Sequence, residues 1–172
     1  VGSSREAGSM STSTAYCTNA ELTTWVMNDQ TTSAAESGQV DIAIANAAVN
    51  PYYGPLTEIP EEAFDKVFHN NVKSVLWLAA LTLPGMASRG GGSFITVGSI
   101  GGIRANTVIG AYGMSKAADH HLIRNLAAEW GPKNVRVNAI APGLIKTDFA
   151  KALWEDDARR KAREDSTPLR RL

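Results

Sequence analysis

The stretch Ser93-Phe-Ile-Thr-Val-Gly-Ser99, followed by Tyr112-Gly-Met-Ser-Lys116, decides the fold of this 172-residue chain. Residues 93–97 are a short apolar run with β-branched side chains, which is typical of a strand buried on both faces. Residues 112–116 lie in a longer segment that ends at Gly131-Pro132, a pair that stops helices. A buried strand that leads into a long helix predicts an α/β domain with a parallel sheet.

The pattern continues on both sides of this stretch. Two further strands are predicted over Val40–Ala45 and Val135–Ile140, both mostly buried. A capping box at Thr18-Asn-Ala-Glu21 predicts a helix that ends before Gly38. A second helical region, straight or kinked, is predicted from Pro60 to about Arg89.

The spacing of Ser99, Tyr112 and Lys116 predicts a proton-transfer site. A phenol is a poor acid at neutral pH, so a nearby cation is needed to favour its phenolate. On a helix, residues four apart share a face, which brings the Lys116 ammonium near the Tyr112 ring and predicts a lowered pKa for Tyr112. Ser99 can then hydrogen-bond the reacting oxygen.

These residues, together with Asn71 in Asn70-Asn-Val-Lys-Ser74, resemble the short-chain dehydrogenase/reductase family. The resemblance implies that Tyr112 is the acid and base, that Lys116 assists it, that Ser99 orients the substrate and that Asn71 belongs to a proton relay. It further implies a Rossmann-like doubly wound parallel sheet and an NAD(P)-dependent oxidoreductase that interconverts a carbonyl and an alcohol. The small-molecule substrate itself is not indicated.

The cofactor would lie at the carboxyl ends of the strands, where open parallel sheets bind ligands. The family motif Asn-Asn-Ala-Gly corresponds to Ala45-Asn46-Ala47-Ala48, which keeps only its two central residues. The family's Pro-Gly loop corresponds to Pro142, Gly143, Ile145 and Thr147. With Tyr112 and Lys116 these residues are the predicted cofactor contacts, although Asn46 could be a plain turn residue and Thr147 a plain helix cap.

Ser4-Arg5 is the remaining candidate for cofactor binding. An arginine at the end of the second strand can pair with the 2′-phosphate of NADP, whereas an acidic residue there suits NAD. Arg5 therefore favours NADP(H) over NAD(H), with a solvated terminal arginine as the alternative.

Both ends of the chain lack parts of the family's fold. Residues 1–172 contain no match to the family's first strand with its glycine-rich turn or to its final strand, so we expect a fragment of a longer protein or a product of truncation. We therefore expect a single partial dinucleotide-binding domain over residues 1–172. The alternative function is a non-catalytic truncated domain that cannot bind cofactor by itself, and epimerase or dehydratase chemistry is a second rival.

Composition and charge limit the classes of partner that the chain can bind. Seventeen basic and seventeen acidic residues leave no basic field for nucleic acid. No stretch predicts a membrane span, and a lone cysteine, Cys17, fits the cytoplasm.

The adjacent His120 and His121 point in different directions on a helix, so no metal site is predicted. The stretch Val72–Leu83 is apolar nearly all round, which predicts a homodimer or homotetramer interface.

Two features are expected near the C-terminus. Phe149, Leu153 and Trp154 form an apolar patch that could be a substrate lid. Residues 156–165 alternate acidic and basic side chains, which is typical of a solvated helix face.

Overall fold

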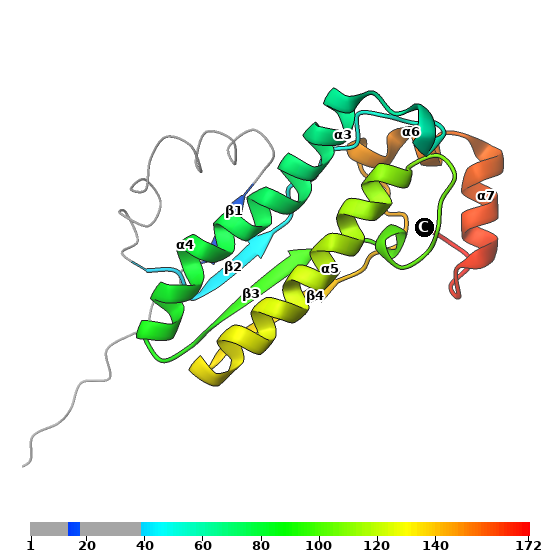
Figure 1. Ribbon diagram of the computed structural model, residues 1–172. Coiled ribbons are helices and arrows are strands. Elements are labelled where there is room, and N and C mark those ends of the chain that lie inside the picture. The colour runs from blue at the N-terminus through cyan, green and yellow to red at the C-terminus, as the bar shows by residue number, and fades with distance from the viewer. Residues whose placement is uncertain (1–13, 18–38) are drawn as a thin grey trace, which may run out of the picture.

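The computed structural model describes residues 14–17 and 39–172, which form a parallel sheet covered by helices (Figure 1). Its four described strands are β1 (Thr14–Cys17), β2 (Ile42–Ala45), β3 (Gly92–Val97) and β4 (Val135–Ile140), in that order across the sheet. All neighbouring strands are parallel, which confirms the predicted α/β class. The helix predicted between Thr18 and Gly38 and the predicted cofactor residues Ser4 and Arg5 lie outside the described residues.

Helices and helical turns connect and extend these strands. In chain order they are η1 (Leu56–Glu58), α3 (Glu61–Phe68), η2 (His69–Lys73), α4 (Ser74–Ser88), η3 (Ile100–Gly102), α5 (Gly110–Trp130), η4 (Gly131–Lys133), η5 (Asp148–Ala150), α6 (Lys151–Trp154) and α7 (Asp157–Ser166).

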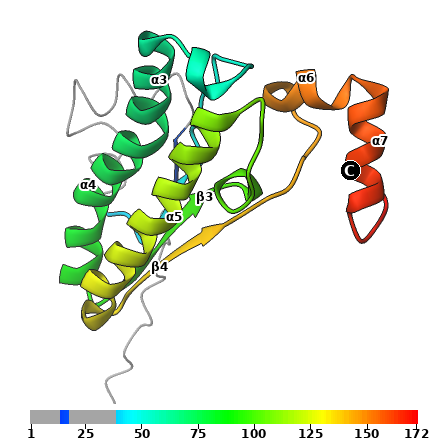
Figure 2. The same cartoon turned by 45° about the vertical axis from the view of Figure 1, so that its right-hand side comes forward.

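The two long helices lie side by side on one face of the sheet (Figures 1 and 2). Helix α4 connects β2 to β3, and α5 connects β3 to β4. Crossovers between parallel strands are nearly always right-handed, so two crossovers that advance in the same direction place their helices on the same face. The buried core lies between this helix pair and the sheet, with Leu78 and Leu83 of α4, Ile123 of α5 and Phe94 of β3 among its members.

Two strands differ from their prediction. Strand β2 begins at Ile42 rather than Val40, and Arg89 engages the two preceding residues: its guanidinium donates to the Val40 carbonyl, and its Nε lies 3.6 Å from Asp41 Oδ1. Strand β4 has the predicted bounds, but the expectation of burial on both faces is wrong. Four of its six residues are exposed, because β4 ends the described strand order and pairs with β3 alone.

The region predicted from Pro60 to about Arg89 is helical, and a π-helical turn separates its two α-helices. Pro60 caps α3, and Glu61 and Glu62 occupy the first turn, where acidic side chains favour the helix dipole. The π turn η2 inserts one extra residue per turn between α3 and α4, and such turns often occur at functional sites. It contains Asn71, one of the predicted catalytic residues.

Helix α4 is apolar on its outer side as well as on its buried side. Leu76 and Leu81 are 45% and 46% exposed, whereas Leu78 and Leu83 are buried. Across residues 14–17 and 39–172, no helix combines the length and apolarity that crossing a bilayer requires.

Candidate active site

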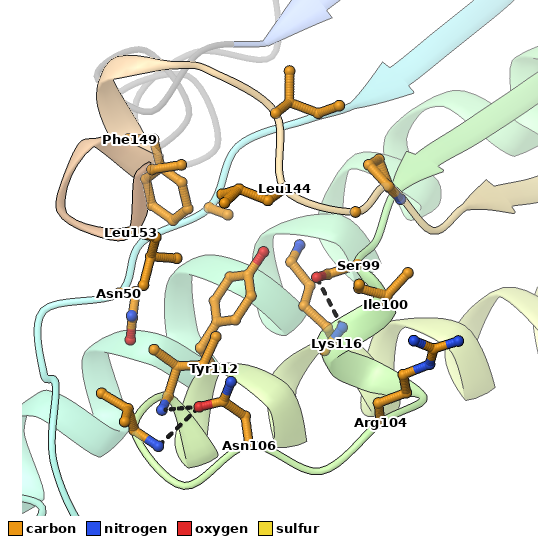
Figure 3. A pocket seen from close by; sticks show the side chains of 18 of the residues that line it. Asn50, Ser99, Ile100, Arg104, Asn106, Tyr112, Lys116, Leu144, Phe149 and Leu153 are labelled. Atoms are coloured by element: carbon orange, nitrogen blue, oxygen red, sulfur yellow. Dashed lines mark hydrogen bonds between the residues drawn. The ribbon is translucent and has the colours of Figure 1, made fainter. Parts of the chain in front are cut away.

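The carboxyl ends of β2, β3 and β4 open onto one cavity of about 890 Å³ (Figure 3). Nine of the residues predicted from sequence line it: Asn46, Ala47, Ser99, Tyr112, Lys116, Pro142, Gly143, Ile145 and Thr147. This agrees with the rule that ligands of open parallel sheets bind outside the carboxyl strand ends.

Backbone hydrogen bonds fix the loops after β3 and β4 against each other. The Gly98 amide donates to the Ile140 carbonyl at 2.8 Å, and the Ile100 amide donates to the Pro142 carbonyl at 3.0 Å. Ser99 lies between these two bonds in extended backbone, and its Oγ accepts the Gly101 amide at 3.0 Å. The predicted Ser99 and the predicted Pro142 loop are therefore held as one rigid unit.

Tyr112 projects from the first turn of α5 into the cavity (Figure 3). Its ring centroid lies 6.1 Å from that of Phe149, a member of the predicted apolar lid. Burial raises the pKa of Tyr112, and a side-chain hydrogen bond with Ser99 opposes this effect. Asp119 and Tyr53 raise the pKa further. The net direction is opposite to the lowering expected from Lys116.

Burial is the largest cause of this difference, and Lys116 is engaged with other partners. Its Nζ donates to the Val97 carbonyl and to Asp119 Oδ2, both at 3.1 Å. The same Nζ lies 5.9 Å from the centroid of the Tyr112 ring. The side chain is almost fully buried, and its charge is compensated by a carboxylate.

Asn71 lies behind the cavity rather than in its lining. It is fully buried, and its Oδ1 accepts the Val49 amide at 2.8 Å. Its Nδ2 donates to the Val49 carbonyl at 3.0 Å and to Ser115 Oγ at 2.9 Å. Asn71 thus connects the π turn to the β2 exit loop and to the residue that precedes Lys116.

The sequence allowed two roles for Thr147, a helix cap and a cofactor contact. It occupies the N-cap position of η5, but its hydroxyl makes no capping hydrogen bond. Its carbonyl accepts Trp154 Nε1 at 3.0 Å, which ties the predicted lid to this loop. The Thr147 hydroxyl therefore borders the cavity without a capping role.

The cavity has contributions that the sequence prediction did not include. Arg104, Arg159 and Arg163 line it, and among the residues that the structure describes no acidic side chain does. Helix α7 is solvated as predicted, with exposed ion pairs such as Lys161 Nζ to Asp165 Oδ2 at 3.7 Å, but some of its residues also line the cavity. Asp119 was missed entirely, although its i, i+3 spacing from Lys116 could have indicated the ion pair.

Comparison with known proteins agrees with this geometry. The family model described as "Enoyl-(Acyl carrier protein) reductase" matches residues 10–172. "Dehydrogenase/reductase SDR family member 4" of Sus scrofa is 45% identical over 135 residues, which are 78% of this chain and 48% of the relative. The Homo sapiens protein of that name is 40% identical over 135 residues, 78% of this chain and 49% of its own length. The chain thus spans about half the length of the curated relatives it matches.

Solved structures show the same architecture. A 7α-hydroxysteroid dehydrogenase complexed with NADH and 7-oxo glycochenodeoxycholic acid is 34% identical with a TM-score of 0.75, covering 90% of this chain and 58% of that one. A gluconate 5-dehydrogenase from Burkholderia cenocepacia, in complex with NADP and tartrate, is 25% identical with a TM-score of 0.79 and the same two coverages.

Proposed function

Because the chain belongs to the short-chain dehydrogenase/reductase family, we propose that it interconverts a carbonyl and an alcohol with a nicotinamide cofactor, using Tyr112 as general acid and base. The observation that carries the proposal is the convergence of Ser99, Tyr112 and Lys116 on one cavity at the strand ends. The substrate is a small molecule that reaches Tyr112 beside Phe149 and Leu153, which border the same cavity.

The cavity residues fit a nicotinamide cofactor. The Thr147 hydroxyl has no capping bond and can accept or donate to a carboxamide, and Gly143 leaves the loop backbone open. We assign Asn46 and Ala47 to the adenosine half, and Pro142, Gly143, Ile145 and Thr147 with Tyr112 and Lys116 to the nicotinamide half. When bound, the cofactor supplies the hydride chemistry. Arg5 together with Ser4 favours NADP(H) over NAD(H).

The chain's own residues handle the proton. During reduction the Tyr112 O–H bond breaks and its proton goes to the substrate oxygen; during oxidation the phenolate takes the hydroxyl proton. Ser99 donates a hydrogen bond to that oxygen, so the two side chains orient it together. Lys116 places its ammonium, which is paired with Asp119, behind the phenol, and Asn71 fixes the backbone on which this set depends.

Fluorescence titration with NADPH and NADH tests the cofactor assignment. We expect saturable binding of both, with NADPH the tighter ligand, and Thr147→Val should weaken it while the exposed Thr57→Val should not. Absence of binding by either cofactor would instead support the alternative, a domain that does not bind cofactor by itself.

Replacement of Tyr112 by Phe tests the chemistry. The ring remains but the proton is lost, so we expect turnover to fall at least about a hundredfold, the usual size of general acid-base catalysis. Tyr52→Phe is the matched control, because the Tyr52 hydroxyl donates to the Pro55 carbonyl outside the cavity lining. Near-normal turnover by Tyr112→Phe would refute the assignment.

We further propose a homodimer or homotetramer, because α4 presents Leu76 and Leu81 to solvent beside α5. The single cysteine, Cys17, is in keeping with a cytoplasmic protein.

A further inference from the structure

Lys116 and Asp119 form a buried ion pair directly behind the proposed proton donor. Lys116 Nζ lies 3.1 Å from Asp119 Oδ2, and the two side chains are 2% and 0% exposed. Removing two charges from water is costly, so a buried pair is retained only with good geometry or for a purpose beyond stability. The hydrogen bond from Nζ to the Val97 carbonyl completes the geometry and anchors the ammonium to β3.

The buried negative charge of Asp119 is compensated by Lys116. Its second oxygen, Oδ1, is buried and has no hydrogen-bond partner among the described residues. Burial raises the pKa of Asp119 to about 6, and the charge and hydrogen bond of Lys116 oppose that rise. On the same helix, burial lowers the pKa of the neighbouring His120, and Arg124 and Lys116 lower it further.

The pair also acts on Tyr112, one turn earlier on α5. Asp119 raises the pKa of Tyr112, and the Tyr53 side chain adds to this from the β2 exit loop. A lone ammonium 5.9 Å from the ring centroid would favour the phenolate. A carboxylate bound to that ammonium opposes its field and adds to the effect of burial, which is the larger cause of the raised Tyr112 pKa.

We propose that Asp119 is a positioning residue that holds Lys116 against the Val97 carbonyl, neutralises its charge and thereby keeps Tyr112 as a neutral proton donor. The inference rests on the proposed function of Tyr112. It deepens that function, because a protonated phenol is the form that donates the proton when a carbonyl is reduced. In that step the Tyr112 O–H bond breaks, the proton passes to the carbonyl oxygen as the carbon gains a hydride from reduced nicotinamide cofactor, and the phenolate is reprotonated from solvent.

A spectroscopic titration tests the proposal without turnover. Phenolate absorbance is recorded against pH for the wild-type chain and for Asp119→Asn, and in each background the Tyr112→Phe counterpart is subtracted. The difference isolates Tyr112 from the other tyrosines. Asparagine keeps the size and a hydrogen-bond acceptor for Lys116 but removes the charge. We expect the Tyr112 midpoint to move to lower pH, with at least roughly threefold more phenolate at a fixed pH below the midpoint.

The control is Glu129→Gln, which removes an exposed carboxylate from the same helix and should leave the midpoint unchanged. An unchanged or raised midpoint in folded Asp119→Asn would overturn the proposal, as would an equal shift in Glu129→Gln. Circular dichroism at each pH checks folding.

The wild-type chain provides a second measurement that needs no Asp119 variant. With ring-labelled tyrosine, the Tyr112 signal in the nuclear magnetic resonance spectrum should shift near pH 6, where Asp119 titrates. A flat Tyr112 signal through that range would contradict the proposal. Failure of the proposed function would give a different result. The chain and all its variants would then show no turnover, while both titrations of Tyr112 would still give the expected shifts.

Discussion

At the scale of single residues, Asn71 stabilises the fold as well as being the residue that the family resemblance assigns to a proton relay. Its amide satisfies both backbone groups of Val49 and contacts Ser115 Oγ while fully buried. Asn71→Ala leaves the Val49 amide and carbonyl without this partner. We expect a loss of roughly 2 to 4 kcal/mol in the free energy of unfolding, the cost of buried polar groups that lose their hydrogen bonds.

Denaturant unfolding measures this loss, and the neighbouring Asn70→Ala is its control. Asn70 Nδ2 donates only to the Lys66 carbonyl at an exposed site, so its removal should cost less than about 1 kcal/mol. Similar losses in both variants would contradict the structural role assigned to Asn71.

Asp119 makes the stability of the chain depend on pH. Its pKa rises from 3.8 to about 6 on folding, so the folded state binds the proton more tightly than the unfolded state. This contribution is fully present below pH 3.8 and is lost as pH rises through about 6, up to about 3 kcal/mol. Relative to Asp119→Asn, the wild-type chain should lose unfolding free energy between these pH values in denaturant titrations. A constant difference across that range would show that Asp119 does not titrate as described.

At the scale of elements, η3 and α5 approach so closely that glycine is required at their contact. A Cβ on Gly102 would lie 2.6 Å from the Lys116 carbonyl carbon and 2.7 Å from the Ala117 amide nitrogen. Both are backbone atoms that cannot move aside. We expect Gly102→Ala to cost about 1 to 3 kcal/mol in denaturant unfolding and to lower turnover, because Ser99 caps η3 and would move with it.

Gly131, at the C-terminal end of the same helix, supplies the control. A Cβ there meets nothing within 4 Å, and the backbone φ of −54° suits alanine. Gly131→Ala should therefore be neutral or stabilise the chain by up to about 1 kcal/mol, by reducing the freedom of the unfolded chain. Equal destabilisation by both substitutions would argue against the close contact.

The sequence predicted the positions of helices and strands better than it predicted the electrostatic environment of the site residues. Short β-branched runs predicted β3 and β4 to within a residue, because strand length and β-branched content leave a local pattern. The positions of Ser99 and Pro142 at the cavity followed from the strand ends together with the family resemblance. The Lys116 and Asp119 pair, by contrast, was not predicted, because the family motif ends at Lys116 and the net charge at a buried site depends on which side chains fold behind it. The lowered Tyr112 pKa expected from Lys116 was reversed chiefly by burial of the phenol, with Asp119 adding to the rise.

At the scale of the whole molecule, the outer side of α4 decides whether the chain associates. Leu76 and Leu81 are each nearly half exposed, and their burial against a second copy would remove apolar surface from water. We expect the double variant Leu76→Glu and Leu81→Glu to shift the chain toward monomer, because it would place like charges across a two-fold interface. Light scattering coupled to size-exclusion chromatography measures the mass. Leu169→Glu is the control, since Leu169 is 72% exposed beyond α7 and should leave the mass unchanged. A wild-type chain that is monomeric at high concentration, or a double variant that keeps the wild-type mass, would exclude this face as the interface.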